Sequence, residues 1–163
     1  MATTRRVPRR SSRAKASTIP RYTIDASVFV NAFNPHEDGH ADSLQLLATI
    51  QARGDPVIVP TLLVPEIASA VARASDDSAG ALQYAYATAG LPHLTLVTLT
   101  PAMVRQAAEL AATHRLRGAD AVYLAVARRY GTTLVSRDDE QRTRGSAAAT
   151  CQTPEEALAG WRA

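Results

Sequence analysis

The residues best suited to chemistry are four carboxylates spread along the chain: Asp25, Glu66, Asp120 and Asp138. Asp25 directly follows a short β-forming run at 22–24, and Asp138 follows another at 132–136. Glu66 lies in the predicted helix that follows the second strand, and Asp120 lies near the start of a strongly apolar helix. Ligands of open parallel sheets bind beyond the carboxyl ends of the strands, so this pattern predicts that the four acids meet at one sheet edge.

Carboxylates gathered at one place repel each other at neutral pH unless protons or cations neutralise them. Oxygen ligands without His or Cys suit Mg²⁺ or Mn²⁺, and such an ion can activate a bound water and hold a phosphoryl oxygen. We therefore expect either raised pKa values among the four acids or divalent ions bound between them. The chemistry predicted is hydrolysis of a phosphodiester bond.

Each acid also has a simpler interpretation. Asp25 could cap the helix that begins at Ala26, and Glu66 or Asp120 could be a favourable acid in the first turn of a helix. Asp138 belongs to a run of three acids that could form a solvated turn and the start of a helix, and Asp139 is an alternative to it as the fourth acid. Taken together, the four acids at strand ends and helix starts favour one shared site over four separate structural roles.

Hydroxyl and guanidinium groups lie close to these acids in the sequence. Ser27 comes two residues after Asp25, and Ser136 two residues before Asp138, so either could orient a carboxylate, a metal-bound water or a phosphate. We expect three arginines to bind substrate phosphates, because a guanidinium can donate to two oxygens at once: Arg115, Arg117 and Arg137. Surface arginines are more often simply solvated.

Charge is distributed unevenly over the 163 residues. The chain carries 18 Lys and Arg against 15 Asp and Glu, a net charge of +3, yet residues 1–21 hold seven of the bases and no acid, which leaves −4 for the rest. We expect residues 1–20 to form a basic, disordered tail and residues 21–163 to form one folded domain. The tail could attract nucleic-acid phosphates or could be a solvated extension.

Several classes of protein are excluded. With 46% apolar residues the chain can bury a core, and no apolar run approaches the roughly 20 residues of a membrane helix. The single cysteine, Cys151, excludes a disulfide framework. No apolar segment follows the Arg5-Arg6 pair, so we expect no export and a cytoplasmic location.

Short apolar runs alternate with helical patterns from residue 21 onward. The sequence predicts strands at 22–24, 57–59, 94–99 and 132–136, with a weak one at 147–151. It predicts helices over 26–33, 42–53, 61–75, from about 77 to 90, 101–115 and 118–130, with a last short helix opened by a capping box at Thr153. The fold class expected is α/β, a three-layer sandwich with a central, mostly parallel sheet flanked by helices.

The motifs resemble those of the PIN-domain nucleases over roughly residues 21–150. The resemblance is carried by four segments in a fixed order: Ile24-Asp25-Ala26-Ser27-Val28, Val59-Pro60 with Glu66 downstream, Gly118-Ala119-Asp120-Ala121 with Leu124-Ala125, and Leu134-Val135-Ser136-Arg137-Asp138. Each segment is short, but their order and spacing are specific together. The length is similar to that of the single-domain VapC-like toxins of toxin–antitoxin pairs.

The resemblance implies a Mg²⁺- or Mn²⁺-dependent ribonuclease whose acidic quartet maps onto Asp25, Glu66, Asp120 and Asp138, with Ser136 as the accompanying hydroxyl. On this resemblance we expect Asp25, Asp120 and Asp138 to hold one or two divalent ions, and Glu66 to be a further ligand or to orient the attacking water. It also implies a homodimer and a small antitoxin that buries the site, often with an inserted arginine. The basic tail is not part of the usual VapC pattern.

Two other functions stay open at this point. A PIN-like fold can serve as a non-catalytic binding module for nucleic acid or protein. A phosphatase-type phosphoryl-transfer enzyme is the other, although the haloacid-dehalogenase-like phosphatases use Asp-x-Asp and here Ser27 takes the place of the second Asp. Receiver domains need a lysine at the sheet end, whereas the only lysine is Lys15.

Overall fold

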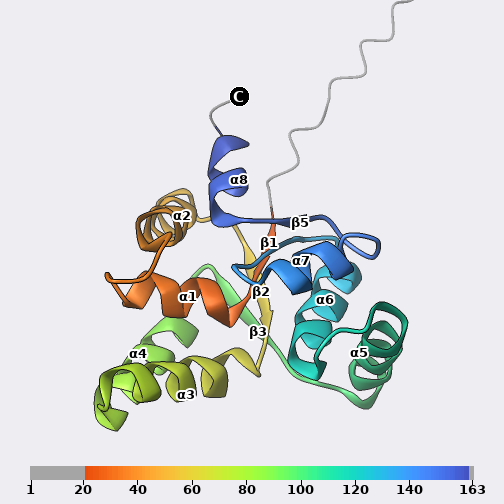
Figure 1. Ribbon diagram of the computed structural model, residues 1–163, viewed down its shortest axis with the longest axis horizontal. Helices are drawn as coiled ribbons and strands as arrows, with labels where there is room; N and C mark the ends of the chain where they lie inside the picture. Colours follow the sequence, from red (N-terminus) through yellow and green to blue (C-terminus); the bar gives the residue numbers. More distant parts are fainter. Residues whose placement is uncertain (1–20, 162–163) are drawn as a thin grey trace, which may run out of the picture.

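A sheet of five parallel strands forms the centre of the computed structural model, which describes residues 21–161 (Figure 1). The strand order is β3-β2-β1-β4-β5, and every neighbouring pair is parallel. The strands are β1 (Tyr22–Ile24), β2 (Val57–Pro60), β3 (Leu94–Val97), β4 (Thr133–Val135) and β5 (Cys151–Gln152). The predicted α/β class with a mostly parallel sheet is therefore confirmed, and the predicted basic tail lies outside the described residues.

Eight helices cover the sheet in the described part of the chain. Figure 1 shows α1 to α4 on one side of the strands and α5 to α7 on the other, which gives the expected three layers. The helices are α1 (Ala26–Phe33), α2 (His40–Arg53), α3 (Leu63–Ser75), α4 (Ser78–Ala89), α5 (Pro101–His114), α6 (Gly118–Tyr130), α7 (Asp139–Gly145) and α8 (Pro154–Ala159). Within residues 21–161, none of them is long and apolar enough to cross a membrane.

The core lies on both faces of the sheet. Ile24, Val59 and Leu134 are fully buried, as continuous apolar strands covered on both faces require. Helix α6 is buried along most of its length and packs against β1, β2 and β4, so its nearly all-apolar sequence reflects its central position.

The order of the strands creates the position for a site. The chain steps outward from β1 to β2 and β3, and then returns to the other side of β1 to form β4 and β5. The connections that leave β1 and β4 therefore diverge, and the space beyond the carboxyl ends of these two strands is a topological switch point.

Several element boundaries differ from the sequence prediction. Helix α2 begins at His40 because Gly39, in the left-handed conformation with φ +76°, turns the chain into it. The last strand is Cys151–Gln152 instead of 147–151, since residues 147–149 form a turn after α7. The sequence predicts only that a helix could start after Asp138. It does not give the extent of α7, because this short helix has no apolar periodicity.

Candidate active site

An open cleft of about 710 Å³ lies at the carboxyl edge of the sheet, at the switch point. All four predicted acids line it, together with side chains from α1, α3 and the α5–α6 connection. The lining residues are Asp25, Ala26, Ser27, Val30, Leu62, Pro65, Glu66, Ser69, Ala70, Arg73, Arg117, Asp120 and Asp138. The structure thus brings together four carboxylates that are up to 113 positions apart in the sequence.

Asp25 is fixed between β1 and α1. Its backbone N–H donates to the carbonyl of Val135 at 2.9 Å, which ties the ends of β1 and β4 together. Its Oδ1 accepts from the N–H of Ser27 at 2.9 Å, so it caps α1 as one interpretation expected, and its Oδ2 accepts from Nε2 of Gln141 at 3.3 Å. Burial raises the pKa of the Asp25 carboxyl, and the negative charge of Asp138 adds to that rise.

Glu66 reaches the cleft from the first turn of α3. Its Oε2 accepts a hydrogen bond of 2.7 Å from the hydroxyl of Tyr123, a residue of α6 that is fully buried. Partial burial raises the pKa of Glu66, and the charges of Asp25 and Asp120 raise it further, while the tyrosine hydroxyl opposes the rise. Tyr123 was not predicted as a site residue, because its place in an apolar helix is typical of a core side chain.

Asp120 lies in the first turn of α6. Partial burial raises its pKa to about 6, and the negative charges of Asp25 and Asp138 contribute to that rise, whereas Arg117 opposes it. The surroundings of Asp120 in the cleft therefore disfavour its ionised form. This is the electrostatic situation in which a cation or protons are bound.

Asp138 caps α7 with its Oδ1, which accepts from the N–H of Gln141 at 2.9 Å, and its Oδ2 lies 3.5 Å from Nη1 of Arg117. The hydroxyl of the fully buried Ser136 accepts from the N–H of Asp138 at 3.0 Å. The hydroxyl of Ser27 accepts from the N–H of Arg137 at 3.1 Å. Both predicted serines thus hold the loop after β4 in place.

Asp139, the alternative fourth acid, is placed differently. Its side chain is 89% exposed and pairs with Arg142 on the outside of α7. It is not among the residues that line the cleft, whereas Asp138 is. The placement therefore favours Asp138 as the fourth acid.

The structure brings only one of the three predicted arginines into the cleft. Arg117 lines it, with a side chain that is 71% exposed. Arg137 turns away to pair with Glu155 at 2.6 Å and to donate to the carbonyl of Asp38 at 3.2 Å. Arg115 is not in the lining either.

Sequence reasoning missed a second arginine of the cleft, Arg73. It lies seven residues after Glu66 in α3, with Ser69 and Ala70 between them on the same helix face. That spacing was a signal that could have found it.

The PIN domain model matches residues 22–145, which is most of the chain. The chain belongs to the PIN domain family. No curated protein sequence matches it significantly. The predicted resemblance is confirmed by the family match and by the solved structures that the fold resembles.

Similar PIN folds come from bacteria and an archaeon. Mycobacterium tuberculosis VapC20, a sarcin–ricin loop cleaving toxin, is 19% identical with a TM-score of 0.66 over 77% of this chain and 95% of that one. PAE2754 of Pyrobaculum aerophilum is 17% identical, with a TM-score of 0.65, and the match covers 89% of this chain and 97% of that one. A chain of VapBC2 from Rickettsia felis, bound to promoter DNA, is 15% identical with a TM-score of 0.60 over 82% and 98%. At these identities the likeness shows the fold.

The carboxylates of this PIN domain line one cleft without surrounding a common point. Among residues 21–161, no group of three or more His, Cys, Asp or Glu side chains is arranged to hold a metal ion. Protein donors occupy oxygens of three of the acids: Gln141 contacts Asp25, Tyr123 contacts Glu66, and Arg117 lies beside Asp138. Each carboxylate oxygen can accept more than one partner, so these contacts leave acceptor capacity toward the cleft.

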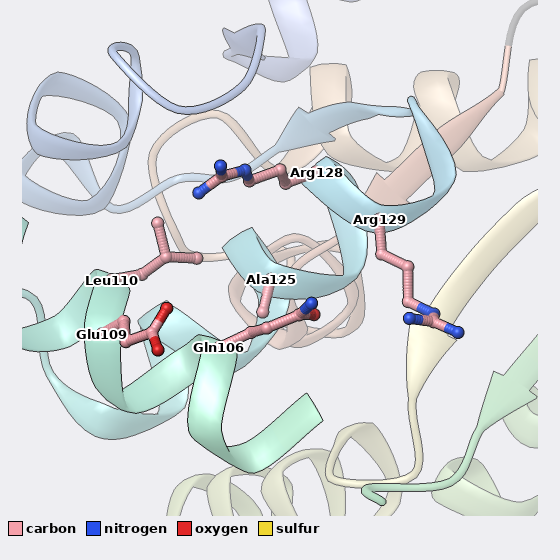
Figure 2. A pocket seen from close by; sticks show the side chains of 6 residues that line it. All are labelled: Gln106, Glu109, Leu110, Ala125, Arg128 and Arg129. Carbon is pink, nitrogen blue, oxygen red and sulfur yellow. The ribbon is translucent and has the colours of Figure 1, made fainter. Parts of the chain in front are cut away.

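A second depression of this PIN domain lies apart from the acids. It is a groove of about 230 Å³ between α5 and α6 (Figure 2). Figure 2 shows the lining side chains on the two helices: Gln106, Glu109 and Leu110 on α5, and Ala125, Arg128 and Arg129 on α6. None of the four predicted acids lines it, so it is not a candidate for the same chemistry.

Proposed function

We propose that this PIN domain is a divalent-metal-dependent endoribonuclease that hydrolyses RNA phosphodiester bonds. The observation that carries the proposal is the convergence of Asp25, Glu66, Asp120 and Asp138 in one open cleft at the switch point. The pKa of about 6 at Asp120 supports it, because burial and the charges of Asp25 and Asp138 disfavour an ionised form that a bound cation would stabilise. Stability alone gives no reason to gather four acids in this way.

The donor set fits Mg²⁺ or Mn²⁺. Asp25, Asp120 and Asp138 would hold the ion or ions, because they offer only carboxylate oxygens and stand at the edge where β1, β4 and α6 meet. When bound, a divalent ion lowers the pKa of a water and neutralises charge on the scissile phosphate. The side chains of the chain itself then have to position the phosphate and accept the proton of the attacking water.

Glu66 is the residue best placed to accept that proton. Its raised pKa lies closer to neutral pH than that of an ordinary glutamate, and the hydroxyl of Tyr123 fixes one of its oxygens. Glu66 also lines the cleft, where the attacking water would bind. Arg73 of α3 and Arg117 at the start of α6 also line the cleft, and they would bind phosphates of the RNA strand.

A cleavage assay tests the proposal. Purified protein and a labelled RNA of a few hundred nucleotides are incubated with Mg²⁺, with Mn²⁺ or with EDTA, and Asp25→Asn is compared with Asp139→Asn. We expect endonucleolytic products only with a divalent ion, loss of at least about 100-fold in rate for Asp25→Asn, and nearly normal activity for the exposed Asp139→Asn. Full activity of Asp25→Asn would overturn the assignment. Absence of cleavage together with RNA binding would favour the non-catalytic module.

We further infer a role as the toxin of a toxin–antitoxin pair, inhibited by a small partner protein, with a homodimer as the assembled form. Structures of similar fold support the part of this inference that concerns the antitoxin, because they include VapBC2 of Rickettsia felis and a toxin–antitoxin complex from Klebsiella pneumoniae. Coexpression with the small reading frame next to this gene, if one is present, should yield a complex that cleaves no RNA. Light scattering of the protein alone measures whether it is a dimer.

A further inference from the structure

Gln141 is a buried amide that contacts three of the four acidic positions. It lies in α7 and is fully buried. Its Nε2 donates to Oδ2 of Asp25 at 3.3 Å and to the backbone carbonyl of Asp120 at 3.3 Å, and its backbone N–H donates to Oδ1 of Asp138 at 2.9 Å. A single residue thereby connects the end of β1, the first turn of α6 and the first turn of α7.

The orientation of this amide follows from its partners. Both groups that face Nε2 are acceptors, so the nitrogen has to point at them and the oxygen has to point away. The Oε1 atom is buried and has no hydrogen-bond partner among residues 21–161. A buried acceptor without a partner destabilises a folded protein, and native structures contain few of them. An apolar side chain of the same size would avoid this loss, but it would also remove the two hydrogen bonds that Nε2 donates.

Close packing of α7 against α6 brings the amide into place. Gly145 lies one helical turn after Gln141, on the same face of α7. A Cβ atom at Gly145 would lie 3.2 Å from Cδ1 of Leu124 in α6 and 3.4 Å from Sγ of Cys151. The glycine thus permits the approach of α7 to the helix that carries Asp120.

We propose that Gln141 is a positioning residue that holds the Asp25 carboxylate in register with Asp120 and Asp138 for binding a divalent cation. The inference rests on the proposed function, since it concerns the same cleft. Donors that contact metal-ligating side chains from behind commonly change metal affinity by 10- to 100-fold when they are removed. A carboxylate oxygen can accept more than one partner, so the bond from Nε2 does not exhaust the acceptor capacity of Asp25 Oδ2.

The test is Gln141→Met, which keeps the volume and removes both the donor and the unpaired acceptor. Isothermal titration with Mn²⁺ should give a dissociation constant about 10- to 100-fold weaker than wild type. The melting temperature of the metal-free variant measures separately the balance between the two lost hydrogen bonds and the removed unpaired acceptor. A merely structural residue would leave the Mn²⁺ affinity of the folded variant unchanged.

Asn31→Leu is the matched control. Asn31 is also a buried amide, but all its polar atoms are bonded, to Glu37, to the carbonyl of Asp38 and to Ser43, and it does not line the cleft. This variant should melt at a lower temperature and bind Mn²⁺ as the wild type does at a temperature where it is folded.

The outcomes are separable. Wild-type Mn²⁺ affinity in a folded Gln141→Met variant would overturn the inference and leave the proposed function standing. Loss of the native circular dichroism spectrum in both Gln141→Met and Gln141→Leu would also overturn it, because the residue would then be needed for folding. Failure of the wild type to bind Mn²⁺ would overturn the proposed function and the inference together.

Discussion

The hydroxyl of Tyr123 donates a 2.7 Å hydrogen bond to Oε2 of Glu66, and this bond joins α6 to α3 at the cleft. Burial and the charges of Asp25 and Glu66 raise the pKa of Tyr123, so its hydroxyl stays protonated and remains a donor at neutral pH. Glu66, by contrast, keeps enough exposure to meet a ligand. A buried donor from the core therefore controls the orientation of an acid in an open cleft.

Tyr123→Phe should lower the rate constant for RNA cleavage by about 10-fold, equivalent to about 1.4 kcal/mol, because Glu66 loses its fixed orientation. The tyrosine hydrogen bond lowers the pKa of Glu66, so its removal raises that pKa further. The acidic limb of the pH–rate profile should therefore move to higher pH. A profile that superimposes on that of the wild type would contradict a role for this bond. Thermal unfolding of Tyr123→Phe and the wild type shows whether the substitution also destabilises the fold.

Asp120→Asn should stabilise the metal-free protein at neutral pH. The pKa of Asp120 rises from its ordinary 3.8 to about 6 on folding, so the native state binds more protons than the unfolded state between these pH values. The stability contributed by this group is thus greatest below pH 4, falls as the pH rises toward 6, and stays low above it. Asparagine carries no charge, so the substitution removes the free-energy cost of holding an ionised carboxylate at this position at neutral pH.

We expect Asp120→Asn to melt roughly 2–4 °C above wild type at pH 7.5 in EDTA, a value reduced for the partial exposure of the group. The difference should vanish below about pH 4, where Asp120 is protonated in both states. The exposed Asp139→Asn serves as the control and should show no such gain. A lower melting temperature for Asp120→Asn at pH 7.5 would show that the ionised carboxylate stabilises the fold.

Arg73→Gln and Arg117→Gln should weaken RNA binding more than they slow catalysis. Both arginines line the cleft, and each phosphate contact that is lost should raise KM and reduce the slope of log affinity against log salt concentration by about 0.7. Arg137→Gln is the control, because Arg137 pairs with Glu155 outside the cleft. It should lower the melting temperature slightly and leave KM unchanged. Equal effects of all three variants would argue against a cleft-specific role.

Local sequence predicts part of the site well. Asp25 and Asp138 each follow a strand, and parallel strands place their carboxyl ends at one edge, so their convergence follows from the fold class. Glu66 and Asp120 stand in the first turns of helices that start at the same edge. The element pattern was therefore sufficient to place all four acids in one cleft.

The supporting contacts could not be predicted, because they join residues far apart in the chain. Tyr123 is 57 positions from Glu66, and Gln141 is 116 positions from Asp25. The prediction for Arg137 relied on its closeness to Asp138, but neighbouring side chains in an extended loop point in different directions, and Arg137 reaches Glu155 instead. Helix α7 has no apolar face that periodicity could reveal, since only Gln141 and Gly145 are buried in it.

Divalent ions should stabilise the wild-type fold and have little effect on Asp25→Asn. A ligand that binds only the native state adds about 2.7 kcal/mol at a concentration 100 times its dissociation constant, which corresponds to a melting temperature roughly 5–11 °C higher for a domain of this size. The shift should shrink as the pH falls toward 5, because protons compete for acids whose pKa values are raised, among them Asp120 at about 6. Thermal unfolding with Mn²⁺, Mg²⁺ and EDTA at pH 5, 6 and 7.5 measures this dependence. Equal shifts for wild type and Asp25→Asn would locate the bound ion away from the cleft.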